Sequence, residues 1–490
     1  MKIKTMFMLF IITCIIIVSS EIRVQGKDIS GATICSFSTP LKTDLIINFK
    51  DKNLENGIRE KINKPNGDIT INDINNIEQL TLNHKNIYSL EGIENLTNLK
   101  KLDFWFNNIN DLHPLSSLTN LENLNLGYNH INDISSLSNL TNLQELNLEN
   151  NNASSLGPLS TLTNLKKLNL TNNQIIDLQP LRTLINLNNL DLYINQIQNI
   201  EPLYSLVNLT ELTLGMNRIV NIEALKSLKK LKLLHLSVNK IINIYSLSNL
   251  TELNDLYLDE NQVKSINPLK GLVKMRILFL LDNEITDVNE LKGLKNLKML
   301  SLANNKIQNL RGLSKLKNLE TLAVDYNEIN SLDGLNSLTN LTNLSLSNNK
   351  INDVKPLSSL LNLKSLDISN NKISDISSLR INAQLPLTYI NFSGNPLPKY
   401  VFTDKLKEES ILNTLSPYII SAIKQYYGEP RLYMNEAILS IEKLQGTFKF
   451  IIRVETFVGP HNPPYGIETM IITQDNSEVK VIDFHHEDEK

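Results

Sequence analysis

The chain has 490 residues, of which 41% are hydrophobic and 20% are charged, a globular composition in a chain too long for one ordinary core. Lys and Arg together number 48 and Asp and Glu number 51, so the charges nearly balance. Because no broad basic field is available to hold phosphates, this balance argues against a nucleic-acid partner.

Residues 1–25 have the pattern of a secretory signal peptide. The stretch MKIKTMFMLFIITCIIIVSSE begins with lysines, continues with an apolar run over 6–18 and ends in small residues. A membrane span takes about 20 apolar residues, so this run is short for one, although an uncleaved anchor is the alternative. Cys14 lies inside the run and lacks the neighbours of a lipidated cysteine. After cleavage Cys35 is the only cysteine, so we expect no internal disulfide, and no later run has the length of a transmembrane segment.

Residues 43–79 are predicted to form an N-terminal helical cap. Leu54, Ile58 and Ile62 fall at helical spacing, which indicates a helix with one apolar face. An array of repeats needs such a cover because its first apolar flank would otherwise face water.

Residues 80–397 repeat the pattern L-x-x-L-x-L-x-x-N with a period of 22 residues. The first copy is degenerate, with Lys85 at the Asn position, and the last copy has Asn395 two residues late, so about 15 copies are expected. The regular asparagines are Asn107, Asn129, Asn151, Asn173, Asn195, Asn217, Asn239, Asn261, Asn283, Asn305, Asn327, Asn349 and Asn371.

Each part of the repeat predicts a local structure. Leu124 and Leu126 alternate as in a short strand, and stacked copies would pair such strands into a parallel sheet. The asparagine that follows is expected to turn inward and satisfy backbone groups of neighbouring copies, which would form an internal ladder.

Six prolines share one position on the return side of the repeat, which predicts 3₁₀ or short helical turns there. These prolines are Pro114, Pro158, Pro180, Pro202, Pro268 and Pro356. The predicted fold class is therefore α/β: a curved solenoid with a parallel sheet on its concave face and short helical turns on its convex face.

The residues between the strand leucines have no packing role and are expected to point outward on the concave face. Apolar and aromatic residues gather there with an acidic border, an arrangement that is typical of a binding surface. The alternative is that these residues only favour strand pairing. The predicted partner-binding residues are Trp105, Phe106, Tyr128, Tyr193, Ile194, Met216, His235, Val238, Tyr257, Phe279 and Leu281. The acidic border consists of Asp191, Glu211, Asp255, Asp259, Glu260 and Asp282.

Residues 398–490 are predicted to form a separate α+β domain. Apolar residues at helical intervals over 403–428 are followed by four strand-like stretches separated by turns, which predicts an antiparallel meander. The stretch GPHNPPYG, residues 459–466, contains two glycines and three prolines and predicts a rigid loop.

One group in this domain has the residue types of a metal or acid–base site: His461, Glu468, Asp483, His485 and His486. Neighbouring strand residues point to opposite faces, so two adjacent histidines are poorly placed to bind one ion, and a shaped loop with a charged tail is the simpler interpretation. No phosphate loop, nucleophile elbow or zinc-protease helix occurs in the sequence. No catalytic residue, metal or cofactor is therefore predicted, and the chain is not expected to be an enzyme.

The copy LTNLENLNLGYNHINDISSLSN, residues 118–139, resembles the 22-residue class of leucine-rich repeats found in bacterial internalin-type surface and secreted proteins. The stretch KDKNLENGIREKINKPNGDITINDINNIEQLTL, residues 50–82, is similar to the helical cap of those proteins. SPYIISAIKQYYG, together with GPHNPPYG, resembles an uncharacterised domain family of Gram-positive spore-forming bacteria.

This resemblance implies a protein that is secreted or held in the cell envelope of a Gram-positive bacterium. Its concave face would bind a protein ligand, which is either a host molecule or a bacterial surface molecule. Two other functions stay open: a structural spacer in the envelope with an idle concave face, and an enzyme whose C-terminal domain acts while the repeats target it.

Overall fold

The computed structural model describes residues 45–376, 378–379 and 389–397, six positions between 415 and 425, and the four strands of a C-terminal sheet. The predicted signal segment, residues 1–25, lies outside the described residues. No helix in the described part of the chain has both the length and the apolar character needed to cross a membrane.

Within the described residues, two helices precede the repeats, α2 (Lys52–Ile62) and α3 (Ile71–Ile74). Asp51 is the N-cap of α2, and its carboxylate accepts hydrogen bonds from the backbone N–H groups of Asn53 and Leu54 at 2.8 and 3.1 Å. The other oxygen of the same carboxylate accepts Tyr88 N at 2.7 Å, which joins the start of the helix to the first repeat.

The apolar face of α2 covers the first repeat, as its spacing predicts. Leu54 and Ile58 are fully buried, and Ile62 is half-buried. Gly57 lies between them, and a Cβ at this position would overlap the Leu82 side chain of the first repeat. The missing side chain therefore lets the helix approach the array closely.

The repeats form one 15-stranded parallel sheet in which each strand pairs with the next strand along the chain. The register is uniform: Leu124 of one strand faces Leu102 before it and Leu146 after it, 22 residues away in each direction. The strands are β1 Gln79–Thr81, β2 Lys101–Asp103, β3 Asn123–Asn125, β4 Glu145–Asn147, β5 Lys167–Asn169, β6 Asn189–Asp191, β7 Glu211–Thr213, β8 Leu233–His235, β9 Asp255–Tyr257, β10 Ile277–Phe279, β11 Met299–Ser301, β12 Thr321–Ala323, β13 Asn343–Ser345, β14 Ser365–Asp367 and β15 Tyr389–Asn391.

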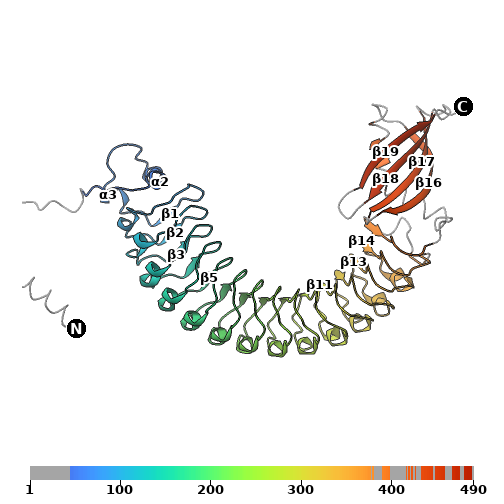
Figure 1. The fold of residues 1–490 in the computed structure, drawn as a ribbon, viewed down its shortest axis with the longest axis horizontal. Coiled ribbons are helices and arrows are strands. Elements are labelled where there is room, and N and C mark those ends of the chain that lie inside the picture. Colours follow the sequence, from blue (N-terminus) through green and yellow to red (C-terminus); the bar gives the residue numbers. More distant parts are fainter. Residues whose placement is uncertain are drawn as a thin grey trace, which may run out of the picture. The chain divides into compact units, whose positions relative to one another are not determined.

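The return side of the repeats is a row of short 3₁₀ helices on the convex face, while the strands line the concave face (Figure 1). The six prolines each occupy the second residue of such a helix, where the backbone N–H would have no partner within the helix. The 3₁₀ helices are η2 Ile93–Asn95, η3 His113–Leu115, η4 Ser135–Asn139, η5 Gly157–Thr161, η6 Gln179–Thr183, η7 Glu201–Ser205, η8 Glu223–Ser227, η9 Tyr245–Leu247, η10 Asn267–Leu269, η11 Asn289–Gly293, η12 Arg311–Leu313, η13 Leu335–Ser337 and η14 Lys355–Ser359.

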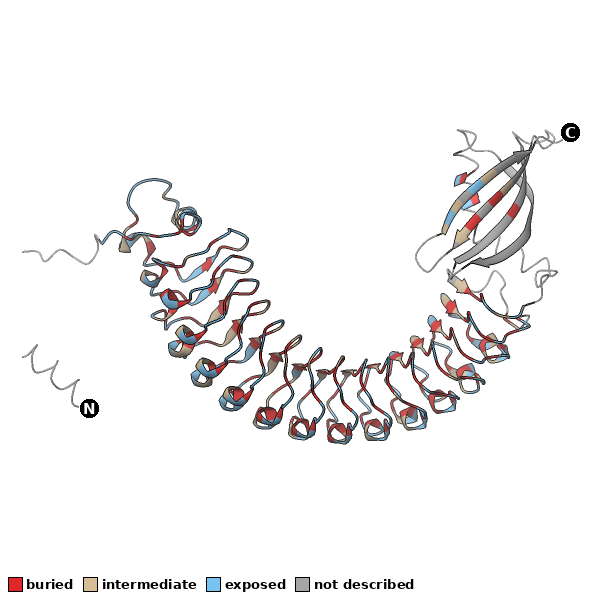
Figure 2. Cartoon of the chain, viewed as in Figure 1, coloured by how far each residue is buried: buried red, intermediate tan, exposed pale blue. Residues whose placement is uncertain are grey.

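The apolar core runs through the centre of the coil, between the strands and the 3₁₀ helices (Figure 2). In one repeat, Leu121, Leu124, Leu126, Ile131 and Ile134 are all at most 2% exposed. All five belong to one apolar cluster that continues through the neighbouring repeats, so a single repeat would not be stable by itself.

The last repeat deviates from the period as the sequence indicates. Asn395 is shifted by two residues, yet its side chain still accepts Ile373 N at 3.0 Å and donates to Phe392 O at 2.8 Å. The shift therefore changes the length of the connection and leaves the role of the asparagine unchanged.

Beyond the array, four strands form an antiparallel meander: β16 Leu432–Leu444, β17 Thr447–Phe457, β18 Gly466–Gln474 and β19 Val479–Glu487. Ile452 of β17 and Met470 of β18 are paired in register, and both are fully buried. Residues 459–465 of the predicted rigid loop, including His461, lie outside the described residues. The predicted fold class, a curved α/β solenoid followed by a smaller strand region, is confirmed.

Candidate binding surface

Three outward rows and one turn row run across the concave sheet. In the second repeat, Lys101 belongs to the first row, Asp103 to the second and Trp105 to the third, and the same rows recur every 22 residues. Phe106 belongs to the turn row, which lies directly before the inward asparagine, Asn107. At every turn-row residue from His84 to Asn370, the backbone has a left-handed conformation with φ between 51° and 58°.

The inward asparagines hold this geometry in place. Asn129 donates through Nδ2 to Phe104 O, Leu126 O and Gly127 O at 3.0–3.2 Å, and its Oδ1 accepts Ile109 N at 2.9 Å. Each amide thus joins its own turn to the preceding repeat, and the same set of bonds recurs at Asn239 and Asn371. The buried amide is thus satisfied by bonds to both repeats, which hold the turn before it in the same conformation in every copy.

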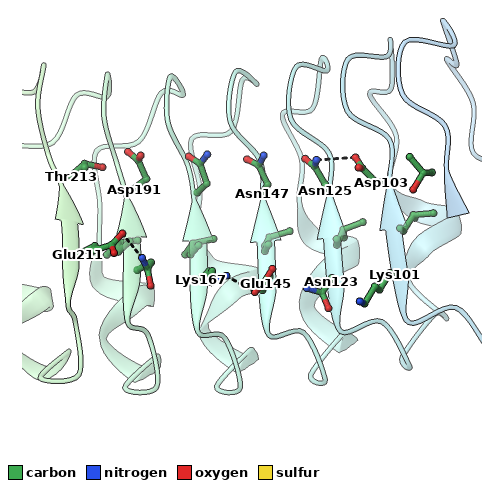
Figure 3. Close-up of a pocket in the computed structure, with 18 of the residues that line it drawn as sticks. Lys101, Asp103, Asn123, Asn125, Glu145, Asn147, Lys167, Asp191, Glu211 and Thr213 are labelled. Carbon is green, nitrogen blue, oxygen red and sulfur yellow. Dashed lines mark hydrogen bonds and ion pairs between the residues drawn. The ribbon is translucent and has the colours of Figure 1, made fainter. Parts of the chain in front are cut away.

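The first and second rows of β1 to β8 line a shallow groove of about 640 Å³ (Figure 3). We call the outward residues on and after β3 to β5 the polar sector, and its first and second rows lie in the central part of this groove. The polar sector consists of Asn123, Asn125, Gly127, Glu145, Asn147, Glu149, Lys167, Asn169 and Thr171.

The charged groups in the polar sector are compensated by one ion pair or by hydrogen bonds from uncharged side chains. Lys167 Nζ lies 2.8 Å from Glu145 Oε1, and this contact lowers the pKa of Glu145 and raises the pKa of Lys167. Asn125 donates to Asp103 at 2.8 Å, and Asn169 donates to Glu149 at 2.9 Å. This part of the groove therefore has few uncompensated charges.

The first aromatic group lies beside the N-terminal end of the polar sector and consists of His84, Trp105, Phe106 and Tyr128. The Trp105 ring centroid lies 4.8 Å from that of His84 and 5.2 Å from that of Tyr128. The Trp105 ring lies over Gly127, where a Cβ would come within 2.9 Å of it, and its Nε1 donates to Glu149 at 3.3 Å. The glycine therefore allows the indole to cross one strand and contact the next.

The second aromatic group consists of Tyr193, His235, Tyr257 and Phe279, and it extends from β6 to β10. Consecutive ring centroids are 5.3 Å apart in each of the three contacts, which is within the range of favourable ring pairing. Tyr193 crosses Gly215 to stack on His235, and a Cβ at Gly215 would lie 2.7 Å from the Tyr193 ring. The same glycine arrangement thus occurs in both aromatic groups.

We call the outward residues on and after β6 to β10 the ring sector, and its charges differ from those of the polar sector. Its three outward rows contain Asp191, Glu211, Asp255 and Asp259 and no Lys or Arg. Burial lowers the pKa of His235 despite the opposing effect of Asp259 and Asp191, so it favours the neutral imidazole. The ring sector is therefore aromatic and acidic.

Burial also shifts the pKa values of Tyr257 in β9 and of Asp259, two residues after it. Burial raises the pKa of Asp259, although Leu281 N and the Ser237 hydroxyl donate to its carboxylate at 2.8 and 3.2 Å. Burial likewise raises the pKa of Tyr257, and the charges of Asp255 and Asp259 add to the effect. The negatively charged forms of both groups are therefore disfavoured in the fold.

The predicted partner-binding residues divide between two positions of the repeat. Six lie on the second or third outward row, namely Trp105, Tyr193, His235, Tyr257, Phe279 and Leu281. The other five lie in the turn row rather than between strand leucines, namely Phe106, Tyr128, Ile194, Met216 and Val238. The chain leaves the extended conformation there because the next residue, the asparagine, must turn inward.

Three residues of this surface were missed by the sequence analysis: His84, Gly127 and Gly215. His84 lies 22 residues before Phe106 in the degenerate first repeat, so extending the period by one copy would have found it. The two glycines follow aromatic third-row residues by 22 positions, which is the corresponding signal for a ring that crosses a strand.

The structure does not test the possible metal or acid–base group of the C-terminal domain. His461 lies outside the described residues, and His485 and His486 are adjacent positions of β19. Among the described residues, no group of three or more His, Cys, Asp or Glu side chains could hold a metal ion.

Three family models match parts of the chain. Leucine-rich repeats (two copies) match residues 163–205, 295–337 and 339–381, and the leucine-rich repeat domain of the endo-beta-N-acetylglucosaminidase EndoS matches residues 49–173. A protein family of unknown function (DUF3888) matches residues 407–488. No curated protein sequence matches the chain significantly.

Solved structures are similar to the repeat array. An internalin (inlF) from Listeria monocytogenes is 37% identical, with a TM-score of 0.64 over 66% of this chain and 96% of that chain. A leucine-rich repeat protein of Leptospira interrogans is 28% identical, with a TM-score of 0.59 over 70% of this chain and 83% of that one. InlJ from Listeria monocytogenes is 20% identical, with a TM-score of 0.60 over 90% and 98% of the two chains, a likeness in fold alone.

Proposed function

The chain belongs to the internalin family of leucine-rich repeat proteins, and we propose that its ring sector binds a protein partner outside the cell that makes it. The observation that supports this proposal best is the continuous row of four rings on the concave face. Tyr193, His235, Tyr257 and Phe279 contact one another across five strands, with no repeat-to-repeat function that requires them. Aromatic residues are enriched among those that dominate the energy of protein interfaces.

The turn row of the ring sector supports the same function. Ile194 and Val238 are β-branched residues with φ of 54° and 57°, a conformation that costs such residues about 1–2 kcal/mol. After β4 and β5 of the polar sector the same position holds Asn150 and Asn172, which adopt it readily, whereas after β3 it holds Tyr128 of the first aromatic group. Strain of this kind persists where the side chain has another use, and contact with a partner is such a use.

The N-terminal sequence supports a location outside the cytoplasm. The signal-like pattern of residues 1–25 and the membership in the internalin family both favour export, either to the medium or to the cell envelope. We further propose the domain division 43–79, 80–397 and 398–490, with binding assigned to the middle domain.

Affinity capture from host-cell and bacterial surface extracts tests the proposed function. The double variant Tyr257→Ala with Phe279→Ala should weaken capture of the partner at least about tenfold, because buried aromatics each contribute about 2 kcal/mol when truncated. Its melting temperature should stay within a few degrees of wild type, because both side chains lie outside the leucine core.

The matched control is Met299→Ala with Thr321→Ala, which alters two first-row positions of β11 and β12 outside the ring sector. This control should capture the partner as wild type does. Equal capture by both double variants would show that the ring sector is not the binding surface. Capture of nothing by any form would favour a spacer with an idle concave face.

A further inference from the structure

Strand β9 and the two residues after it, Asp255–Asp259 with sequence DLYLD, present two carboxylates on either side of one aromatic ring. Asp255, Tyr257 and Asp259 alternate with buried leucines, so all three face the concave side, about 6–7 Å apart along the strand. Building on the proposed function, we propose that this segment binds a cationic side chain, an arginine or a lysine, of the protein partner.

The carboxylate of Asp255 lacks the compensation that a protein usually provides. Its neighbours in the first row are Leu233 and Ile277, which have no hydrogen-bonding side chains. Asp255 Oδ1 is shielded from solvent and has no hydrogen-bond donor among the described residues. The residue as a whole is only half-buried, so the rest of the carboxylate stays within reach of a partner. A guanidinium or ammonium group at the other carboxylate oxygen would supply a donor to the carboxylate and the opposite charge.

The Tyr257 ring provides a second contact for the same cation. It lies between His235 and Phe279 at centroid distances of 5.3 Å, so its neighbours hold it in place along the row. A cation within about 6 Å of such a ring is attracted to its face, and the attraction is stronger where water is excluded. The long aliphatic part of a lysine or arginine would meanwhile contact Leu233 and Ile277.

The charge of the three outward rows favours a basic partner. These rows of the ring sector contain four carboxylates and no Lys or Arg, and burial favours the neutral form of His235 between them. The exposed Lys232 and Arg276 lie one position before the first row. In the polar sector, Lys167 already neutralises Glu145 at 2.8 Å. A basic segment of the partner would therefore be attracted to the ring sector and not to the polar sector.

Isothermal titration of the full-length protein with short synthetic peptides tests this inference. One peptide contains two arginines in a Gly-Ser background, and the other replaces both arginines with citrulline, which has nearly the same shape and no charge. We expect the arginine peptide to bind and the citrulline peptide to bind at least about tenfold more weakly, the factor that a charge-assisted hydrogen bond provides. Binding of the arginine peptide should weaken at high salt.

The variant Asp255→Asn keeps the shape of the side chain and removes its charge. It should weaken binding of the arginine peptide about tenfold or more, and its melting temperature should not fall, because no donor to Asp255 is lost. The control is Asp287→Asn at an exposed position before η11, which changes the net charge equally and should bind as wild type. Equal binding of both peptides, or equal binding by both variants, would overturn the inference.

A failure of the cation site can be distinguished from a failure of the proposed function. If Asp255→Asn captures the natural partner as wild type does while Tyr257→Ala with Phe279→Ala does not, the ring sector binds a partner without a cation at Asp255. That result would overturn the cation site and leave the proposed function standing.

Discussion

The polar sector and the ring sector share one backbone and one interior but differ in every outward row. Inside, Asn151 and Asn239 make the same hydrogen bonds, and Leu146 and Leu256 are equally buried. Outside, the polar sector pairs Glu145 with Lys167 and binds Glu149 through Asn169. The ring sector has four carboxylates without a Lys or Arg in its outward rows and places four aromatic rings in a row. Because both sectors fold by the same interior contacts, the outward differences are not needed for folding and are available for recognition.

The largest expected effect tests whether the two interiors are equivalent. Asn151→Ala and Asn239→Ala each remove three donated bonds and one accepted bond, which should lower the free energy of unfolding by about 1–3 kcal/mol in both cases. Urea denaturation followed by circular dichroism measures both values. A clear difference between the two losses would show that the sectors differ inside as well as outside.

The turn row should give a smaller effect, with opposite signs in the two sectors. Ile194→Asn and Val238→Asn should each raise the free energy of unfolding by about 1 kcal/mol, because asparagine accepts the left-handed conformation more readily. Asn172→Val makes the reverse change in the polar sector and should lower it by a similar amount. The same denaturation measurement applies, and a loss of stability in both asparagine variants would contradict the interpretation of the turn row as strained.

The smallest expected change in the free energy of unfolding comes from Asp259 and Glu145, two carboxyls whose pKa values are shifted in opposite directions. It is under about 1 kcal/mol, because both groups are partly exposed. The pKa of Asp259 is raised in the fold, so its contribution becomes unfavourable as pH rises above its ordinary value of 3.8. Asp259→Asn should therefore stabilise the protein at about pH 7 and have no such benefit at about pH 3, where the carboxyl is protonated in both states.

Glu145 should behave in the opposite way. Its pKa is lowered by Lys167, so its stabilising contribution is present above its ordinary value of 4.5 and is lost as pH falls through the folded value. Glu145→Gln should destabilise the protein at about pH 7 and less so at about pH 3. Unfolding curves of Asp259→Asn and Glu145→Gln at the two pH values measure these changes. If both substitutions changed the free energy of unfolding in the same direction at pH 7, the contrast between the sectors would be contradicted.

The repeat fold and its interior could be predicted from the sequence because the repeat has a strict period. Each residue 22 positions from another must occupy the same place in the next coil, so the buried leucines, the inward asparagines and the prolines of the 3₁₀ helices follow from the pattern alone. Even the irregular last copy, with Asn395 two residues late, keeps its hydrogen bonds.

The outward surface was predictable only in part, because its contacts depend on conformation and on residues in neighbouring coils. Alternation suggests that Ile194 and Val238 extend the strand face, but the left-handed turn that sends the asparagine inward also redirects the residue before it. Whether Tyr193 reaches His235 depends on the absence of a side chain at Gly215, one coil away. The sequence by itself therefore determined the repeat and its interior, whereas the tertiary structure decided which side chains meet on the concave face, because that depends on backbone direction and on space between coils.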